Sequence, residues 1–150
     1  MHKPISVIHG PNLNALGRRE AQIYGTQTLE DLYSHLTQKA DAIGTKLQFF
    51  QSNLEGELVG EIQRASAECG AIIINPGAFS HTSIAVLDAL LTFKGPIVEV
   101  HLSNIHQRES FRHTSLTSRA ARGIIAGFGF QGYELALQAC VEELAKNSPS

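Results

Sequence analysis

Residues 71–75 read Ala-Ile-Ile-Ile-Asn (AIIIN), an uninterrupted apolar run that ends in an amide side chain. Such a run, with no polar residue in alternation, is typical of a strand buried on both faces, as in a parallel sheet. Pro76 and Gly77 follow directly, and both residues favour a turn. The stretch therefore favours an α/β fold, in which helices cover both faces of a parallel sheet.

Four further runs resemble the first and recur along the chain. They are residues 5–10 (ISVIHG), 46–52 (KLQFFQS), 96–101 (PIVEVH) and 123–129 (GIIAGFG). Between the strands, apolar residues three and four apart predict helices over about 29–43, after Thr28 as N-cap, and over 54–69, 83–91 and 133–146. The pattern predicts a βα unit repeated five times, forming a five-stranded, parallel, doubly wound, flavodoxin-like sheet. We expect a single domain over residues 1–150, with a frayed tail at about 147–150.

Composition and charge restrict the possible ligands. The chain has 150 residues, 43% of them hydrophobic, and a net charge of -2 with 12 Lys and Arg that do not cluster. We therefore expect a small ligand and no nucleic-acid partner. No apolar run has the length of a membrane span and no signal-peptide pattern is present, so we expect no membrane association and a cytoplasmic location. Cys69 and Cys140 show no metal or disulfide spacing and are expected to be small core or interface residues.

Polar residues follow the ends of four predicted strands, in HGPNLN (9–14), QSN (51–53), NPGAFSH (75–81) and HLSN (101–104). Ligands of open parallel sheets bind beyond the carboxyl ends of the strands, so these segments predict a binding site. Turn chemistry alone could explain any single one of these residues. The candidates that converge on this edge are Asn12, Asn14, Asn53, Asn75, Asn104, His81, His101 and Ser103.

The connection over residues 10–27 is long for a loop without its own helix or strand, which is typical of a lid or binding loop. It carries Tyr24, Arg18 and Arg19. A guanidinium near a phenol favours the phenolate, so Tyr24 could act as a general base activated by Arg19 or Arg18. The alternative is that the ring of Tyr24 only anchors the loop.

Glu99 and His101 lie two residues apart at the end of the fourth predicted strand, so their side chains leave the same face. A carboxylate beside an imidazole fixes its tautomer and favours its protonated form, which suits a general acid. The alternatives are a structural histidine, or a zinc site that also uses His81.

Two other motifs have competing interpretations. The segment GFGFQG (127–132) matches G-x-G-x-x-G, but it follows the last strand, so we interpret it as a strand-to-helix turn rather than a dinucleotide site. The segment RESFRH (108–113) contains Arg112, whose planar fork suits a carboxylate or phosphate. The alternative for Arg112 is a solvated surface charge.

Six motifs together resemble type II 3-dehydroquinate dehydratase, over residues 5–138. They are GPNLNALGRREAQIYG (10–25), QSNLEGEL (51–58), INPGAFSHTS (74–83), EVHLSN (99–104), RESFRH (108–113) and GIIAGFGFQGYELAL (123–137). The resemblance implies the flavodoxin-like fold, no metal or organic cofactor, and conversion of 3-dehydroquinate to 3-dehydroshikimate by anti elimination of water through an enolate. It also implies a homo-oligomer built from trimers, often a dodecamer.

The resemblance further implies residue roles. Tyr24 is similar to the family's base and Arg19 to the lid arginine that activates it. Asn12 would hold a water against the enolate oxygen, and His101, oriented by Glu99, would protonate the departing hydroxyl. The implied binding residues are Asn75, His81, Ser103 and Arg112, with backbone N–H groups around Leu102 and Ser103, and Asp88 reaching a neighbouring subunit's site.

The sequence departs from the family pattern at Leu54, where histidine is common, and at Leu87, where arginine often precedes the aspartate. Because of these two departures, the resemblance makes no prediction for helix capping or subunit contacts at Leu54 and Leu87. A non-catalytic binding protein on the same fold, including a nucleotide or flavin binder, is the alternative function, because fold alone does not establish function.

Overall fold

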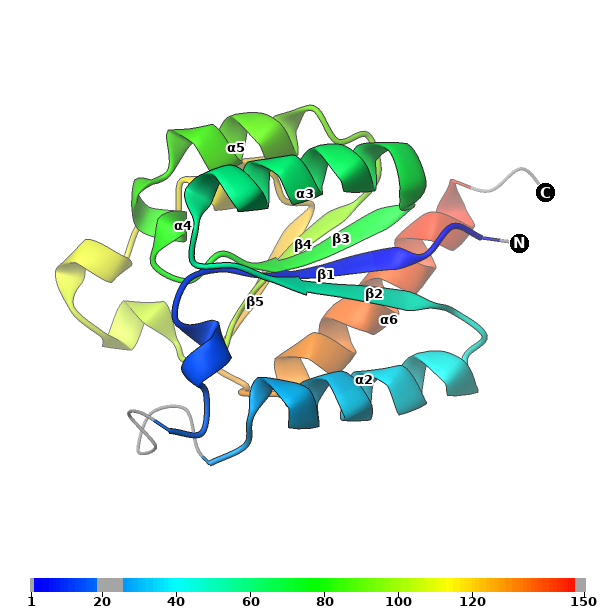
Figure 1. Ribbon diagram of the computed structural model, residues 1–150, viewed down its shortest axis with the longest axis horizontal. Coiled ribbons are helices and arrows are strands. Elements are labelled where there is room, and N and C mark those ends of the chain that lie inside the picture. The colour runs from blue at the N-terminus through cyan, green and yellow to red at the C-terminus, as the bar shows by residue number, and fades with distance from the viewer. Residues whose placement is uncertain (1, 19–25, 148–150) are drawn as a thin grey trace.

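The computed structural model describes residues 2–18 and 26–147 (Figure 1). Its centre is a five-stranded sheet in the order β2-β1-β3-β4-β5, with every neighbouring pair parallel. The strands are β1 (Ile5–His9), β2 (Leu47–Gln51), β3 (Ala71–Asn75), β4 (Ile97–His101) and β5 (Gly123–Ala126). This order confirms the predicted flavodoxin-like, doubly wound arrangement.

Helices cover both faces of the sheet, as predicted (Figure 1). Helices α2 (Leu29–Ala42) and α6 (Gln131–Lys146) pack on one face, and α3 (Glu55–Glu68) and α5 (Ile84–Leu91) on the other. A short helix, α4 (Phe79–Thr82), follows β3. None of the helices in the described ranges is both long and apolar enough to cross a bilayer.

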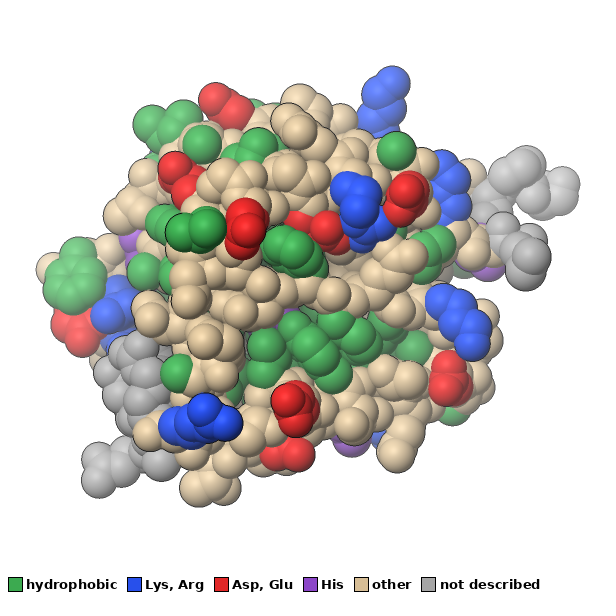
Figure 2. Space-filling model, in the orientation of Figure 1, with side chains coloured by type: hydrophobic (Ala, Val, Ile, Leu, Met, Phe, Trp, Pro, Cys, Tyr) green, Lys and Arg blue, Asp and Glu red, His purple; other side chains and the backbone are tan. Residues whose placement is uncertain are grey.

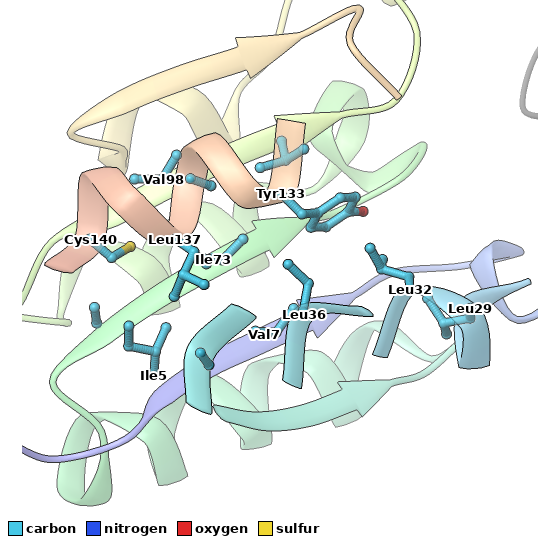
Figure 3. Packing of buried hydrophobic residues seen from close by; sticks show 14 of the residues in the cluster. Ile5, Val7, Leu29, Leu32, Leu36, Ile73, Val98, Tyr133, Leu137 and Cys140 are labelled. Carbon is cyan, nitrogen blue, oxygen red and sulfur yellow. The ribbon is translucent and has the colours of Figure 1, made fainter. Parts of the chain in front are cut away.

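Successive residues of each central strand enter different cores. Val7 and Ile73 pack with α2 and α6 (Figure 3), whereas Ile8 and Ile72 pack with α3 and α5. This is the two-residue period of a pleated strand. The same alternation continues to the strand ends, where the site residues lie, so adjacent positions there face opposite sides of the sheet.

The outer strands are less buried than predicted. Every residue of β1, β3 and β4 is buried, but β2 is only partly buried and Gly123 and Ile124 of β5 are exposed. The expectation of burial on both faces was wrong for β2 and β5, because they are the edges of the sheet. Figure 2 shows hydrophobic side chains at the surface between β2 and α2.

The connection between β4 and β5 has no α-helix, so the predicted fivefold βα repeat was wrong at this step. It contains three short 3-10 helices instead, η2 (Ile105–Gln107), η3 (Ser110–Arg112) and η4 (Thr117–Ala120). The reason is visible in the sequence, because Ile105, Phe111 and Leu116 are six and five residues apart and form no helical stripe. The segment instead builds one wall of the site.

The N-cap of α2 and the two cysteines agree with the predictions from the sequence, whereas one short helix was not predicted. Thr28 caps α2 in a reciprocal capping box with Asp31, as the sequence predicted. Cys69 and Cys140 are buried and free. The loop after β1 contains a 3-10 helix, η1 (Leu13–Ala15), which the sequence did not predict. The expected fraying at about 147–150 lies almost wholly outside the described residues.

Candidate active site

A cavity of about 140 Å³ opens at the carboxyl ends of β1, β3 and β4. It lies where the strand order reverses between β1 and β3, the position at which doubly wound sheets bind ligands. The two loops that leave these strands meet without side chains between them. A Cβ on Gly10 would lie 2.1 Å from the Pro76 carbonyl oxygen, and Gly77 has φ +61 with the Pro11 carbonyl oxygen 3.0 Å from its would-be Cβ. Glycine is therefore required for the close approach that shapes the floor.

Seven of the predicted site residues line this cavity. Those in its wall are Asn12, Asn75, His81, His101, Leu102, Ser103 and Arg112. Asn14 borders a different hollow, beside α2, and Asp88 is exposed on α5 away from the cavity. Asn104 caps η2 by accepting a hydrogen bond from the His106 N–H, 3.1 Å away, so it serves turn chemistry. Tyr24 and Arg19 lie outside the described residues.

His101 and Glu99 form the predicted pair. His101 Nε2 lies 2.8 Å from Glu99 Oε2, and the glutamate is fully buried. Because Nε2–H donates to the carboxylate, Nδ1 is the nitrogen that remains for a ligand in the cavity. The contact confirms the expectation that the side chains leave the same face of β4.

Two hydroxyls that the sequence analysis missed complete the environment of Glu99. Ser115 Oγ donates to Oε2 over 2.6 Å, and Thr117 Oγ1 donates to Oε1. Burial alone would raise the pKa of Glu99, but the hydrogen bond and charge of His101, together with the two hydroxyls, outweigh burial and hold that pKa below its ordinary value. A buried carboxylate needs hydrogen-bond donors, so the sequence could have indicated that Glu99 has such partners. The positions of Ser115 and Thr117 in the sequence do not show that they are the donors.

Asn12 has a left-handed backbone, with φ 69, and is the only non-glycine residue with positive φ in the described ranges. Its N–H donates to Asn53 Oδ1 over 2.9 Å, and Gln51 Nε2 donates to the same oxygen over 3.1 Å. Asn53 therefore lies behind the cavity wall and supports Asn12 from the end of β2. Such a conformation costs on the order of 1 kcal/mol or more and persists where neighbouring groups hold it.

The cavity wall also carries cationic and imidazole groups. His81 Nδ1 donates to the Thr114 carbonyl oxygen over 2.8 Å, so Nε2 is the ring nitrogen that remains for a ligand in the cavity. Arg112 lines the same wall, 5.1 Å above the Phe111 ring and bonded through Nε to Glu109. Arg108 also lines the cavity, although only Arg112 of this segment was predicted to do so. Two guanidinium groups favour a ligand that carries a carboxylate or a phosphate.

The competing motifs have structural explanations. Residues 127–132 form the turn from β5 into α6, with φ +99 at Gly127 and +57 at Gly129, as predicted. No group of three or more His, Cys, Asp or Glu within residues 2–18 and 26–147 is placed to hold a metal ion, so the zinc alternative has no ligand set there.

Comparison with known proteins identifies the family. The model of the family described as dehydroquinase class II matches residues 3–141. The chain belongs to this family. It is 52% identical to the 3-dehydroquinate dehydratase of Actinobacillus pleuropneumoniae over 144 residues, which are 96% of this chain and 94% of that protein.

Solved class II structures show the same fold. The type II dehydroquinase from Butyrivibrio crossotus has a TM-score of 0.91 at 40% identity, covering 93% of this chain and 98% of that one. The enzyme from Propionibacterium acnes has a TM-score of 0.89 at 46% identity, covering 93% and 96%. The resemblance inferred from six motifs is therefore confirmed.

The two departures from the family pattern lie outside the cavity wall. Leu54 is 61% exposed and gives α3 no side-chain cap, but its N–H donates to Ser52 Oγ over 2.9 Å. Leu87 lies on α5, beside Asp88. Neither leucine contributes to the lining of the cavity.

Proposed function

We propose that this protein is a hydro-lyase that dehydrates 3-dehydroquinate to 3-dehydroshikimate. The observation that carries the proposal is the buried His101–Glu99 pair, which opens into a cavity that Asn12 and Arg112 also line, in a chain of the dehydroquinase class II family. A proton donor, an amide and a guanidinium in one cavity match a substrate with a leaving hydroxyl, a ketone and a carboxylate.

The elimination proceeds in two proton transfers. A base removes a proton from the carbon next to the ketone, and the electron pair moves onto the ketone oxygen as an enolate. The amide of Asn12 orients a water that donates to this oxygen, which stabilises the developing charge. The enolate then reforms the ketone as the carbon–oxygen bond breaks, and His101 gives its proton to the departing hydroxyl, which leaves as water.

Glu99 makes His101 a suitable acid. An ionised carboxylate 2.8 Å from Nε2 stabilises the imidazolium and fixes its ring, so the second proton lies on Nδ1, toward the cavity. The direction of the Glu99 pKa, below its ordinary value, supports an ionised carboxylate at neutral pH. The base in this proposal is Tyr24, activated by Arg19, and both lie outside the described residues.

Binding of the substrate uses the remaining residues of the wall. The amide of Asn75 and the imidazole of His81 contact ring hydroxyls, and Arg112 with the backbone N–H groups of Leu102 and Ser103 receives the carboxylate. Their place in the lining of the cavity supports this assignment.

The proposal also covers assembly and location. We propose a homo-oligomer of trimers, as a dodecamer, in which Asp88 reaches the site of the next subunit. The position of Asp88 on an exposed helix, with Ile84 63% and Leu91 59% exposed on the same helix, supports a subunit contact there. A cytoplasmic location, and a role in the shikimate or quinate pathway without cofactor or metal, complete the proposal.

The test is the ultraviolet absorbance of the conjugated enone after addition of 3-dehydroquinate, in the presence of a metal chelator. Wild-type protein should produce the absorbance, whereas Tyr24→Phe and His101→Ala should lose turnover by about a hundredfold or more, as expected for a general base and acid. Asn14→Ala is the matched control, because Asn14 lies outside the cavity. Folded wild type without any absorbance change would leave a binding protein on this fold, and near-normal turnover in Tyr24→Phe would transfer the base role elsewhere.

A further inference from the structure

A buried hydrogen-bonded chain reaches the cavity through Asn75, and two of its members, His9 and Tyr133, have no role in the mechanism above. Tyr133, at the start of α6, brings its hydroxyl within 3.0 Å of both Asn75 Nδ2 and His9 Nε2. His9 and Asn75 are the register partners at the ends of β1 and β3, on the face that α6 covers. His9 and Tyr133 are fully buried, and Asn75 is 3% exposed. Figure 3 shows the Tyr133 ring within this core, with its hydroxyl at the edge of the labelled cluster.

The direction of each hydrogen bond in this chain is fixed. The Asn75 amide nitrogen can only donate, so the Tyr133 oxygen accepts from it. The Tyr133 hydroxyl proton then needs an acceptor, and the remaining neighbour is His9 Nε2. Burial lowers the pKa of His9 to about 3, so the ring is neutral and Nε2 can accept. The His9 proton therefore lies on Nδ1, 3.4 Å from the Tyr33 hydroxyl oxygen.

This chain sets the orientation of the Asn75 side chain. Its Oδ1 accepts from the Gly77 N–H over 3.1 Å, and its Nδ2 donates one proton to Tyr133. A flipped amide would place N–H against N–H at Gly77 and would deprive Tyr133 of its donor. The second proton of Nδ2 is left for the cavity that Asn75 lines. Asn75 therefore presents a donor, which suits a hydroxyl or carboxylate oxygen of the ligand.

We propose that Tyr133, held by His9, is a positioning residue that orients the Asn75 amide for ligand binding. The inference rests on the proposed function, because it requires that 3-dehydroquinate is the ligand of this cavity. Tyr133 touches no ligand itself, so its effect passes through Asn75. An amide that binds ground state and transition state alike changes KM and leaves kcat nearly unchanged.

The experiment measures KM and kcat for 3-dehydroquinate in the full chain. Tyr133→Phe should raise KM by about 3- to 10-fold, the factor that corresponds to one lost hydrogen bond, with kcat within about twofold. Asn75→Ala should raise KM at least as much, and the double variant should be no worse than Asn75→Ala alone, because the two changes remove one interaction. Tyr33→Phe is the matched control, since it removes a tyrosine hydroxyl at the far end of the same chain and should leave KM unchanged.

A second pair of variants covers the case in which Tyr133→Phe does not fold. His9→Gln keeps an acceptor near the position of Nε2 and should have a KM within about twofold of wild type, whereas His9→Leu should raise KM by about 3- to 10-fold. If wild type turns over and Tyr133→Phe has the same KM as wild type, the positioning role is overturned and the proposed function stands. The same holds if wild type turns over and His9→Gln and His9→Leu have equal KM values. No turnover by folded wild type overturns the proposed function, and this inference with it.

Discussion

Acid should destabilise this protein through His9, a group that takes no part in proton transfer to the substrate. His9 is fully buried, and desolvation lowers its pKa from 6.5 to about 3. In the unfolded chain the imidazole takes up a proton below pH 6.5, whereas in the folded protein it stays neutral until about pH 3. The stability from a neutral His9 is therefore complete above pH 6.5 and is lost as the pH falls toward 3.

The size of the effect follows from the shift. Within that window the free energy of unfolding falls by about 1.4 kcal/mol per pH unit for one proton. Between pH 6.5 and pH 4 the loss from His9 is therefore about 3 kcal/mol, a large part of the stability of an ordinary domain. Carboxylates whose pKa lies below the ordinary value, such as Glu99, also contribute less to the stability of the protein as the pH falls toward acid. The measurement therefore has to isolate the contribution of His9.

The comparison is between wild type and His9→Gln, which fills the site with a side chain that does not titrate. Urea unfolding is followed at pH 7, 6, 5 and 4, at one protein concentration because association contributes to apparent stability. Wild type should lose about 3 kcal/mol more than His9→Gln between pH 7 and pH 4, since all other titrating groups are common to both. Parallel stability curves for the two proteins would refute the reasoning, because they would show that His9 titrates alike in both states.

Three further substitutions test other contacts. Thr117→Val removes a donor to Glu99, so the pKa of Glu99 should rise, the acid limb of the kcat/KM profile should move to higher pH, and kcat should fall by about tenfold. Asn53→Ala removes the acceptor that holds the Asn12 N–H and should lower kcat by about 3- to 10-fold, measured beside an unfolding curve within about 1 kcal/mol of wild type. Thr28→Ala removes the capping box of α2 and should cost about 1 kcal/mol in urea unfolding while kcat is unchanged; a matching loss of kcat would contradict a purely structural cap.

Structural features that depend on residues close together in the sequence were predictable. The apolar runs located all five strands, and Thr28 located the start of α2, because strand burial and helix capping are decided within a few positions. The Glu99–His101 contact was predictable for the same reason, since residues two apart on a strand share a face. Family membership came from motifs that are each local.

What the sequence did not reveal depends on contacts between distant segments. His9 and Tyr133 are 124 positions apart, and no spacing rule predicts that their side chains meet under Asn75. Ser115 and Thr117 reach Glu99 only because the β4–β5 connection turns back as 3-10 helices. That connection was also the place where the predicted fivefold βα repeat was wrong, because its apolar residues form no helical stripe.

The alternation of faces along the strands divides the site between two cores. Asn75 is supported from the side of α2 and α6, through Tyr133 and His9, whereas Glu99 and His101 point to the other side, where Ser115 and Thr117 cover them. The hydrogen bond that Asn75 offers the substrate and the delivery of the proton by His101 therefore depend on different sets of packed residues. Selection can therefore adjust the environment of the acid without disturbing Asn75, so homologues adapted to different acidities should differ around Ser115 and Thr117 in the β4–β5 connection and keep the contacts of His9 and Tyr133.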